Sequence, residues 1–165
     1  MTEPVRNHAR EGKQKMMDQS PVRKARPDFR WQDIEVLEYN PHSGAPFKDV
    51  SRQVLFQDAA DHSEWRYFEV APGGYSTLER HQHTHAVMIL RGRGRCLVGR
   101  HLFDVGERDL ISVPPLTWHQ FRAPDNGCLG FLCLVSRDRD HPQLPGHEDL
   151  AALNSDPGVA GFIRV

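Results

Sequence analysis

Between residues 53 and 135 the chain is divided into short apolar runs by glycine, proline and asparagine turn signals. Most of these runs have the length of a β-strand, and none has the length and 3.6-residue period of an amphipathic helix. Many short strands at this spacing are typical of an antiparallel sandwich or barrel, so the sequence predicts an all-β fold. The expected strands are 53–56, 65–70, 75–83, 86–90, 96–98, 101–103, 110–113, 118–123 and 129–135.

Two glycine-containing segments inside this region are expected to form turns between strands. Residues 72–74 read Pro-Gly-Gly, and residues 91–95 read Arg-Gly-Arg-Gly-Arg. Glycine provides the positive φ angles that tight turns require. The second segment lacks the glycine spacing and the following helix of a phosphate-binding loop, and one copy is weak support for RNA binding. We therefore interpret it as a hairpin turn with solvated arginines.

The two ends of the chain differ from this middle region. Residues 1–30 contain eight lysines and arginines, four acidic residues and only isolated apolar positions. Such a segment cannot bury enough surface to offset its chain entropy, so we expect a disordered or loosely docked N-terminal arm. Residues 31–140 are expected to form the barrel. Residues 141–165 are polar and rich in proline at their start, and we expect a wrapping coil with at most a short helix near residues 147–153.

Composition excludes several classes of function. The formal net charge of −1 gives no overall field to attract nucleic acid. No run approaches 18 apolar residues, which excludes a membrane-spanning helix, and the N-terminus lacks the apolar core of a signal peptide. Cys96, Cys128 and Cys133 are odd in number and lack a disulfide or zinc spacing, so we expect buried free thiols and a cytoplasmic location.

A histidine cluster is the strongest functional signal. His81, His83 and His85 lie two residues apart, Glu79 precedes them at the same spacing, and His119 follows on a later predicted strand. These residues lead into an apolar strand, where buried ionisable groups are costly unless they are paired or bind a cation. The cluster therefore predicts one divalent transition metal. Without a thiolate ligand to select zinc, the choice among Fe, Mn, Ni, Cu and Zn stays open.

The segment from residue 72 to about residue 135 resembles a small single-domain cupin, a double-stranded β-helix of the jelly-roll class. The first cupin motif has a histidine pair, then a glutamate or histidine, and then a glycine after six further residues. With Gly92 on that glycine, His85 falls on the glutamate or histidine position, His81 on the second histidine and Glu79 on the first. Most cupins have histidine where this chain has Glu79.

The second cupin motif resembles residues 108–119, whose last residue, His119, provides the remaining ligand in that family. Two ligand sets then compete: Glu79, His81, His85 and His119, or His81, His83, His85 and His119. We favour the first set, because His81, His83 and His85 would span about 13 Å in a straight strand, too far for joint ligation unless the chain bends. In that set His83 is the predicted catalytic residue, as a substrate contact or proton shuttle.

Strand parity predicts the surroundings of this site. Tyr75, Val87 and Ile89 share the phase of His81, and Phe121 shares that of His119, which would give a largely apolar pocket for a small organic ligand. Segments 86–90 and 129–135 are apolar in both phases, so their outer faces require cover. A second subunit or the N-terminal arm would provide it, and we expect a homodimer.

The resemblance to cupins implies a metal-dependent enzyme, with a dioxygenase-type oxidoreductase acting on a small organic substrate as the leading expectation. Isomerase and lyase activities also occur on this fold. The alternative is a non-catalytic module that binds or senses a small ligand through its metal. In either case the expected partner is a small molecule, and neither nucleic acid nor a membrane.

Overall fold

The computed structural model describes residues 21–39, 45–138 and 140–165, and the chain divides into two units, Met1–Ile34 and Glu35–Val165. The described residues of the first unit include a short turn closed by a bridge between Ala25 and Trp31. The predicted N-terminal arm spans residues 1–30, and its residues 1–20 lie outside the described part. The second unit contains both the expected barrel and the C-terminal segment.

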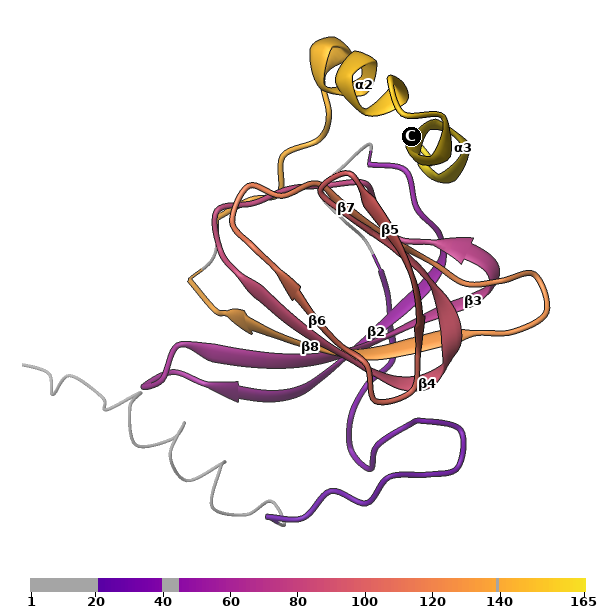
Figure 1. The fold of residues 1–165 in the computed structure, drawn as a ribbon. Coiled ribbons are helices and arrows are strands. Elements are labelled where there is room, and N and C mark those ends of the chain that lie inside the picture. Colours follow the sequence, from indigo (N-terminus) through magenta and orange to yellow (C-terminus); the bar gives the residue numbers. More distant parts are fainter. Residues whose placement is uncertain (1–20, 40–44, 139) are drawn as a thin grey trace, which may run out of the picture. The chain divides into compact units, whose positions relative to one another are not determined.

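The second unit is built from an antiparallel sheet that curves into a barrel (Figure 1). The predicted all-β fold is confirmed. Within the described residues the strands are β1 (Leu37–Glu38), β2 (Lys48–Asp58), β3 (Ser63–Tyr75), β4 (His85–Val98), β5 (His101–Gly106), β6 (Leu110–Val113), β7 (His119–Arg122) and β8 (Leu129–Ser136).

The two longest strands organise the barrel, because each pairs with different neighbours along its length. Strand β3 pairs with β2 on one edge and with β8 on the other, and its last residue, Tyr75, pairs with Arg122 of β7. The first half of β4 pairs with β6 and β8, and its second half pairs with β5 and β7. This change of partners closes the sheet around a common interior.

The predicted turns at residues 72–74 and 91–95 are wrong, because β3 and β4 run through them. Gly92 has a φ of +70°, and a Cβ there would lie 2.1 Å from the Cys128 carbonyl oxygen. A register shift between Ile89 and Arg91 bends β4 at this position. The glycines therefore allow bends and close strand contacts within long strands. The β4–β5 connection comes later, at Gly99 and Arg100.

The predicted strand at residues 75–83 is also wrong, since β3 ends at Tyr75 and residues 76–84 form a loop. This loop has only isolated bridges, one of which joins Glu79 to His119 through two backbone hydrogen bonds of 3.2 and 3.0 Å. The backbone N–H of Leu116 also donates to the His81 carbonyl at 2.7 Å. The loop is therefore held by the β6–β7 connection and the start of β7, without a continuous ladder.

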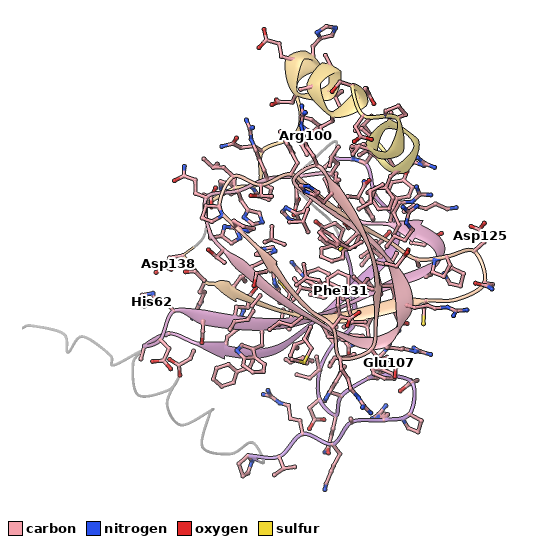
Figure 2. The ribbon with its side chains drawn as sticks, in the orientation of Figure 1. His62, Arg100, Glu107, Asp125, Phe131 and Asp138 are labelled. Carbon is pink, nitrogen blue, oxygen red and sulfur yellow. The ribbon has the colours of Figure 1, made fainter. Side chains whose placement is uncertain are left out.

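Aromatic and aliphatic side chains fill the barrel interior. The Phe131 ring stacks on the rings of Phe121 and Phe68, with centroid distances of 4.7 and 5.5 Å. Figure 2 shows Phe131 in the interior, enclosed by the strands. Val87 and Ile89 of β4 are fully buried in the same cluster. This core holds β3, β4 and β8 in the register that positions the site described below.

The C-terminal segment forms two helices, α2 (His147–Asn154) and α3 (Pro157–Phe162). The expected coil is therefore wrong for residues 157–162. Asp156 caps α3 by accepting hydrogen bonds from the backbone N–H groups of Gly158 and Val159, and Pro157 occupies the first turn, where its missing N–H costs nothing. Apolar residues of both helices form a second core with the barrel: Leu78, Leu97, Leu153, Val159, Phe162 and Ile163.

The opposite faces of β4 and β8 are partly exposed. Trp65, Met88 and Leu134 are 42%, 40% and 38% exposed, and the cross-strand register places them on one side of the sheet with Leu110 and Leu132. We call these five residues the outer apolar face. The homodimer expected from the sequence stays a prediction for this face. No helix in the described ranges is long and apolar enough to cross a membrane.

Candidate metal centre

The predicted ligands converge from three parts of the chain. Glu79, His81 and His83 come from the loop after β3, His85 begins β4, and His119 begins β7. All five side chains line one cavity of about 340 Å³ in the barrel. The bridge between Glu79 and His119 brings the loop and β7 together, and β4 pairs with β7 through Val98 and His119.

The donor atoms form two overlapping groups. Those of His81, His83 and His85 lie within 4.8 Å of one another, and so do those of Glu79, His81 and His119. The chain bends at residues 82 and 83, and the His81 ring centroid lies 3.7 Å from that of His83 and 4.1 Å from that of His85. The straight strand assumed in the distance argument is therefore wrong, and distance does not separate the two ligand sets.

Hydrogen bonds to backbone carbonyls orient two of the imidazoles. His81 Nδ1 lies 2.7 Å from the His83 carbonyl oxygen, and His119 Nδ1 lies 2.9 Å from that of Thr117. Because a carbonyl only accepts, each Nδ1 carries the proton and donates it, which leaves the Nε2 lone pair of the neutral ring available. His81 Nε2 is buried and has no hydrogen-bond partner among the described residues. Such an orphaned nitrogen fits a metal ligand.

His83 is oriented by a carboxylate. Its Nδ1 donates to Asp140 Oδ1 at 2.7 Å, and its Nε2 lies 3.0 Å from His85 Nε2. Two nitrogens that bind one ion at about 2.1 Å and at right angles are about 3.0 Å apart, so His83 also fits a ligand position. The geometry therefore brings His83 into the cluster and leaves its role, ligand or proton carrier, open to experiment.

Asp140 holds the histidine loop in place and was missed in the sequence. Its carboxylate accepts hydrogen bonds from the backbone N–H groups of Gln82 and His83, at 2.8 and 3.2 Å, in addition to the His83 ring. Burial opposes ionisation, but these hydrogen bonds outweigh it and lower the Asp140 pKa to about 2. Asp140 lies in a charged segment without periodicity, where nothing in the sequence distinguishes it from solvated neighbours.

Burial keeps the imidazoles neutral, as metal ligands must be. It lowers the pKa of His119 to about 4, and burial together with the neighbouring His119 lowers that of His85 well below its usual range. Burial and the nearby His83 also lower the His81 pKa. Each ring therefore presents an unprotonated nitrogen near neutral pH.

Glu79 is the one carboxylate among these five side chains. Burial raises its pKa to about 7, and the Arg66 guanidinium opposes that shift. Its Oε1 lies 3.9 Å from His119 Nε2, and its Oε2 is buried without a hydrogen-bond partner in the described part of the chain. A bound cation would compensate this buried charge. The donor set as a whole fits a divalent transition metal and does not select among Fe, Mn, Ni, Cu and Zn.

Only two of the four pocket residues predicted from strand parity line the cavity. Val87 and Phe121 line the cavity, whereas Ile89 is buried in the core and Tyr75 ends β3; neither lines the cavity. Other lining residues were missed because long-range strand pairing brings them to the cavity, and the sequence does not reveal that pairing. They include Tyr39, Arg52, Arg66, Phe68, Phe131 and Cys133.

Comparisons with known proteins agree with this fold. The family model of the cupin domain matches residues 66–135. The chain is 51% identical over 146 residues to 1-methylthio-D-xylulose 5-phosphate methylsulfurylase from Rhodospirillum rubrum. This match covers 88% of this chain and 94% of that protein.

Two solved structures are similar over nearly their whole length. A cupin 2 conserved barrel domain protein from Rhodopseudomonas palustris is 56% identical, with a TM-score of 0.82, and the match covers 87% of this chain and 99% of that one. A cupin-2 domain protein from Rhodospirillum rubrum is 52% identical, with a TM-score of 0.77 and coverage of 87% and 96%. The barrel, its histidine cluster and these relatives together establish that the chain belongs to the cupin family.

Proposed function

We propose that this chain is a metal-dependent enzyme that acts on 1-methylthio-D-xylulose 5-phosphate, or on a similar ketose phosphate, at its methylthio group. The observation that carries the proposal is the 51% identity to the Rhodospirillum rubrum methylsulfurylase, which extends over 94% of that relative. The donor cluster and the cavity beside it support the proposal, because they offer one place for both a metal and a small substrate.

In this proposal Glu79, His81, His85 and His119 hold the metal, the set that the cupin resemblance implies. A divalent metal bound there would act as a Lewis acid on a substrate oxygen. A ketose offers a carbonyl and a neighbouring hydroxyl oxygen that together suit such a site. The four residues would keep these oxygens at the end of the cavity where the loop after β3 meets β4 and β7.

His83 is the proposed proton acceptor. Its Nδ1–H donates to Asp140, so its Nε2 is the atom that can take the proton of an acceptor thiol and return it to the substrate carbon. The thiol sulfur would bond to the methylthio sulfur as the bond from that sulfur to the substrate carbon breaks, and the carbon would take the proton. The Asp140 carboxylate would then stabilise the charged imidazolium that forms. This division of roles gives His83 a catalytic task that is separate from metal binding.

The apolar lining would receive the methylthio group. Val87, Phe121 and Phe131 line the same cavity as the histidines. A thioether is apolar and polarizable, and its sulfur packs favourably against aromatic rings. These residues would also exclude water from the carbon that loses the methylthio group.

The test is direct conversion of the substrate. Protein of measured metal content is incubated with 1-methylthio-D-xylulose 5-phosphate, with and without a small thiol as acceptor, and the products are followed by mass spectrometry. With the thiol present we expect a ketose phosphate with hydrogen in place of its methylthio group, together with the methyl disulfide of the thiol, at a rate that depends on metal. His101→Ala, which changes an exposed histidine outside the cavity, is the matched control. No conversion with any of the five candidate metals would contradict the proposal.

The dioxygenase-type oxidoreductase predicted from the sequence is the second candidate, favoured by the apolar cavity wall beside a histidine and carboxylate donor set. An oxygen electrode distinguishes it, since O₂ uptake that requires a chelating substrate would support oxygenase chemistry. Saturable ligand binding with neither conversion nor O₂ uptake would favour the non-catalytic binding or sensing module.

A further inference from the structure

Two arginines line the cavity that contains the histidine cluster. Arg52 lies on β2 and Arg66 on β3. Arg52 pairs with Phe68 and Val54 pairs with Arg66, so the two arginines are diagonal neighbours on the same inner face of the sheet. Burial raises the pKa of the Tyr39 hydroxyl, and both guanidinium groups oppose that shift. Their positive charges therefore act on the same part of the cavity.

The charge of Arg66 is partly compensated. Its side chain is 9% exposed, and its Nε lies 3.4 Å from Glu64 Oε1. Glu64 also accepts a hydrogen bond of 2.6 Å from Gln57 Nε2, so this carboxylate serves two partners. A buried cation is stabilised when a carboxylate lies close to it. Glu64 and Arg66 together contribute little net charge to the cavity.

Arg52 has no such compensation. No carboxylate among the described residues lies within ion-pair distance of it, and its Nε is buried without an acceptor. A buried polar donor that lacks an acceptor costs free energy, and a charged one costs more. An anion in the cavity would remove this cost by accepting from Arg52. The wall formed by Arg52 and Arg66 thus carries a net positive charge toward the cavity.

This wall lies close to the histidine cluster. The Arg66 guanidinium lowers the pKa values of both Glu79 and His85, although burial is the larger influence on each. In the sheet, Arg66 pairs with Cys133 and Cys133 pairs with Val87, so one strand separates β3 from β4. Their backbones are therefore roughly 10 Å apart. A small molecule with two polar ends can reach both walls.

We propose that Arg52 and Arg66 form the anion-binding subsite of this cavity and hold the phosphate group of the substrate. The identity of the anion rests on the proposed function, whereas the subsite rests on the two arginines. Guanidinium groups suit phosphate, because their planar N–H donors bind its oxygens in pairs. The phosphate end of the ketose binds at Arg52 and Arg66, and its carbonyl end reaches Glu79 and the histidines.

The experiment measures binding without turnover. Titration calorimetry compares D-xylulose 5-phosphate with D-xylulose, using full-length protein of known metal content. We expect the phosphorylated sugar to bind more tightly, and Arg52→Gln to weaken its binding by about 10- to 100-fold, the usual effect of losing hydrogen bonds to a charged group. Arg52→Gln should leave the weaker binding of D-xylulose unchanged. Arg66→Lys, which keeps the charge beside Glu64, should weaken binding of the phosphorylated sugar less.

Arg93→Gln is the matched control, because Arg93 lines a second hollow with Arg95 and Arg122. Unchanged binding in Arg52→Gln, or weakened binding in Arg93→Gln instead, would overturn the subsite. Circular dichroism of each variant verifies that it is folded. If D-xylulose 5-phosphate binding depends on Arg52 but the methylthio substrate is never converted, the subsite stands and the proposed function fails. If conversion proceeds with the same KM in Arg52→Gln, the function stands and the subsite fails.

Discussion

The two walls of the cavity present opposite chemistry and are held in different ways. The histidine wall (Glu79, His81, His83, His85 and His119) comes largely from a loop and from strand ends, and local hydrogen bonds orient its rings. The arginine wall (Arg52 and Arg66) comes from the middle of two long paired strands. The comparison shows that one wall depends on individual polar contacts and the other on strand register.

The difference extends to charge. Burial leaves the histidines neutral and their nitrogens available to a cation. The arginine wall instead presents guanidinium groups, which suit an anion. A ligand with a metal-binding end and an anionic end would match both walls at once. The predictions below separate the two walls, from the largest expected effect to the smallest.

The largest effect is expected for His81→Ala combined with His119→Ala. Both residues belong to either ligand set, so the double variant should retain almost no metal by elemental analysis and should lose activity on the methylthio substrate. The arginine wall should be unaffected, and binding of inorganic phosphate should change by less than about threefold, since the charged hydrogen bonds are retained. Full metal occupancy in this variant would rule out the proposed centre, with His101→Ala as the control.

His83→Ala tests whether His83 transfers a proton or binds the metal. If His83 is the proton acceptor, turnover should fall by about 10²- to 10⁴-fold while most of the metal remains bound. Asp140→Asn should slow turnover less, because it disturbs the orientation of His83 without removing the ring. Single-turnover rates and metal analysis of the same samples provide the measurement. Loss of metal in His83→Ala but not in Glu79→Gln would show that His83 is a ligand.

Glu79 should make the free energy of unfolding of the metal-free protein depend on pH. Its pKa is raised to about 7 by burial, so the folded state holds a proton that the unfolded state loses at lower pH. This contribution to stability is present below the unfolded pKa of 4.5 and is lost as pH rises through about 7. Relative to Glu79→Gln, the wild-type protein should lose on the order of 3 kcal/mol between these limits.

Urea unfolding of both metal-free proteins at pH 4.5, 6 and 8 provides the measurement. Added metal should reverse the loss in the wild-type protein, because a bound cation stabilises the ionised carboxylate. Parallel pH profiles for the two proteins would contradict the buried, proton-holding state of Glu79.

The smallest effect on either wall is expected from changes on the outer apolar face. Met88→Lys with Leu134→Lys places two charges on this face, and we expect the predicted homodimer to dissociate, halving the mass measured by light scattering. Metal content and phosphate binding should stay unchanged, because Cys133 and Val87, on the inner side of the same strands, are untouched. A monomeric wild-type protein would show that the predicted homodimer is wrong.

Much of the barrel was visible in the sequence because a strand's inward and outward alternation is a local pattern. Segments 110–113 and 129–135 were predicted close to their observed bounds as β6 and β8. The continuity of β3 and β4 was missed, since a glycine that allows a bend and one that forms a turn look alike in the sequence. Only the partner strand, such as the one that places Cys128 against Gly92, distinguishes them.

The sequence by itself determined the donor chemistry: histidines two residues apart, a preceding glutamate and a later histidine, in a chain that forms strands. Tertiary structure decided what surrounds them. Three features depend on residues distant in the chain: the bend at residues 82 and 83, the hydrogen bond from His83 to Asp140, and the placement of Arg52 and Arg66 in the same cavity. Residue type and spacing are local properties, whereas burial, orientation and charge pairing arise only when strands pair and the barrel closes.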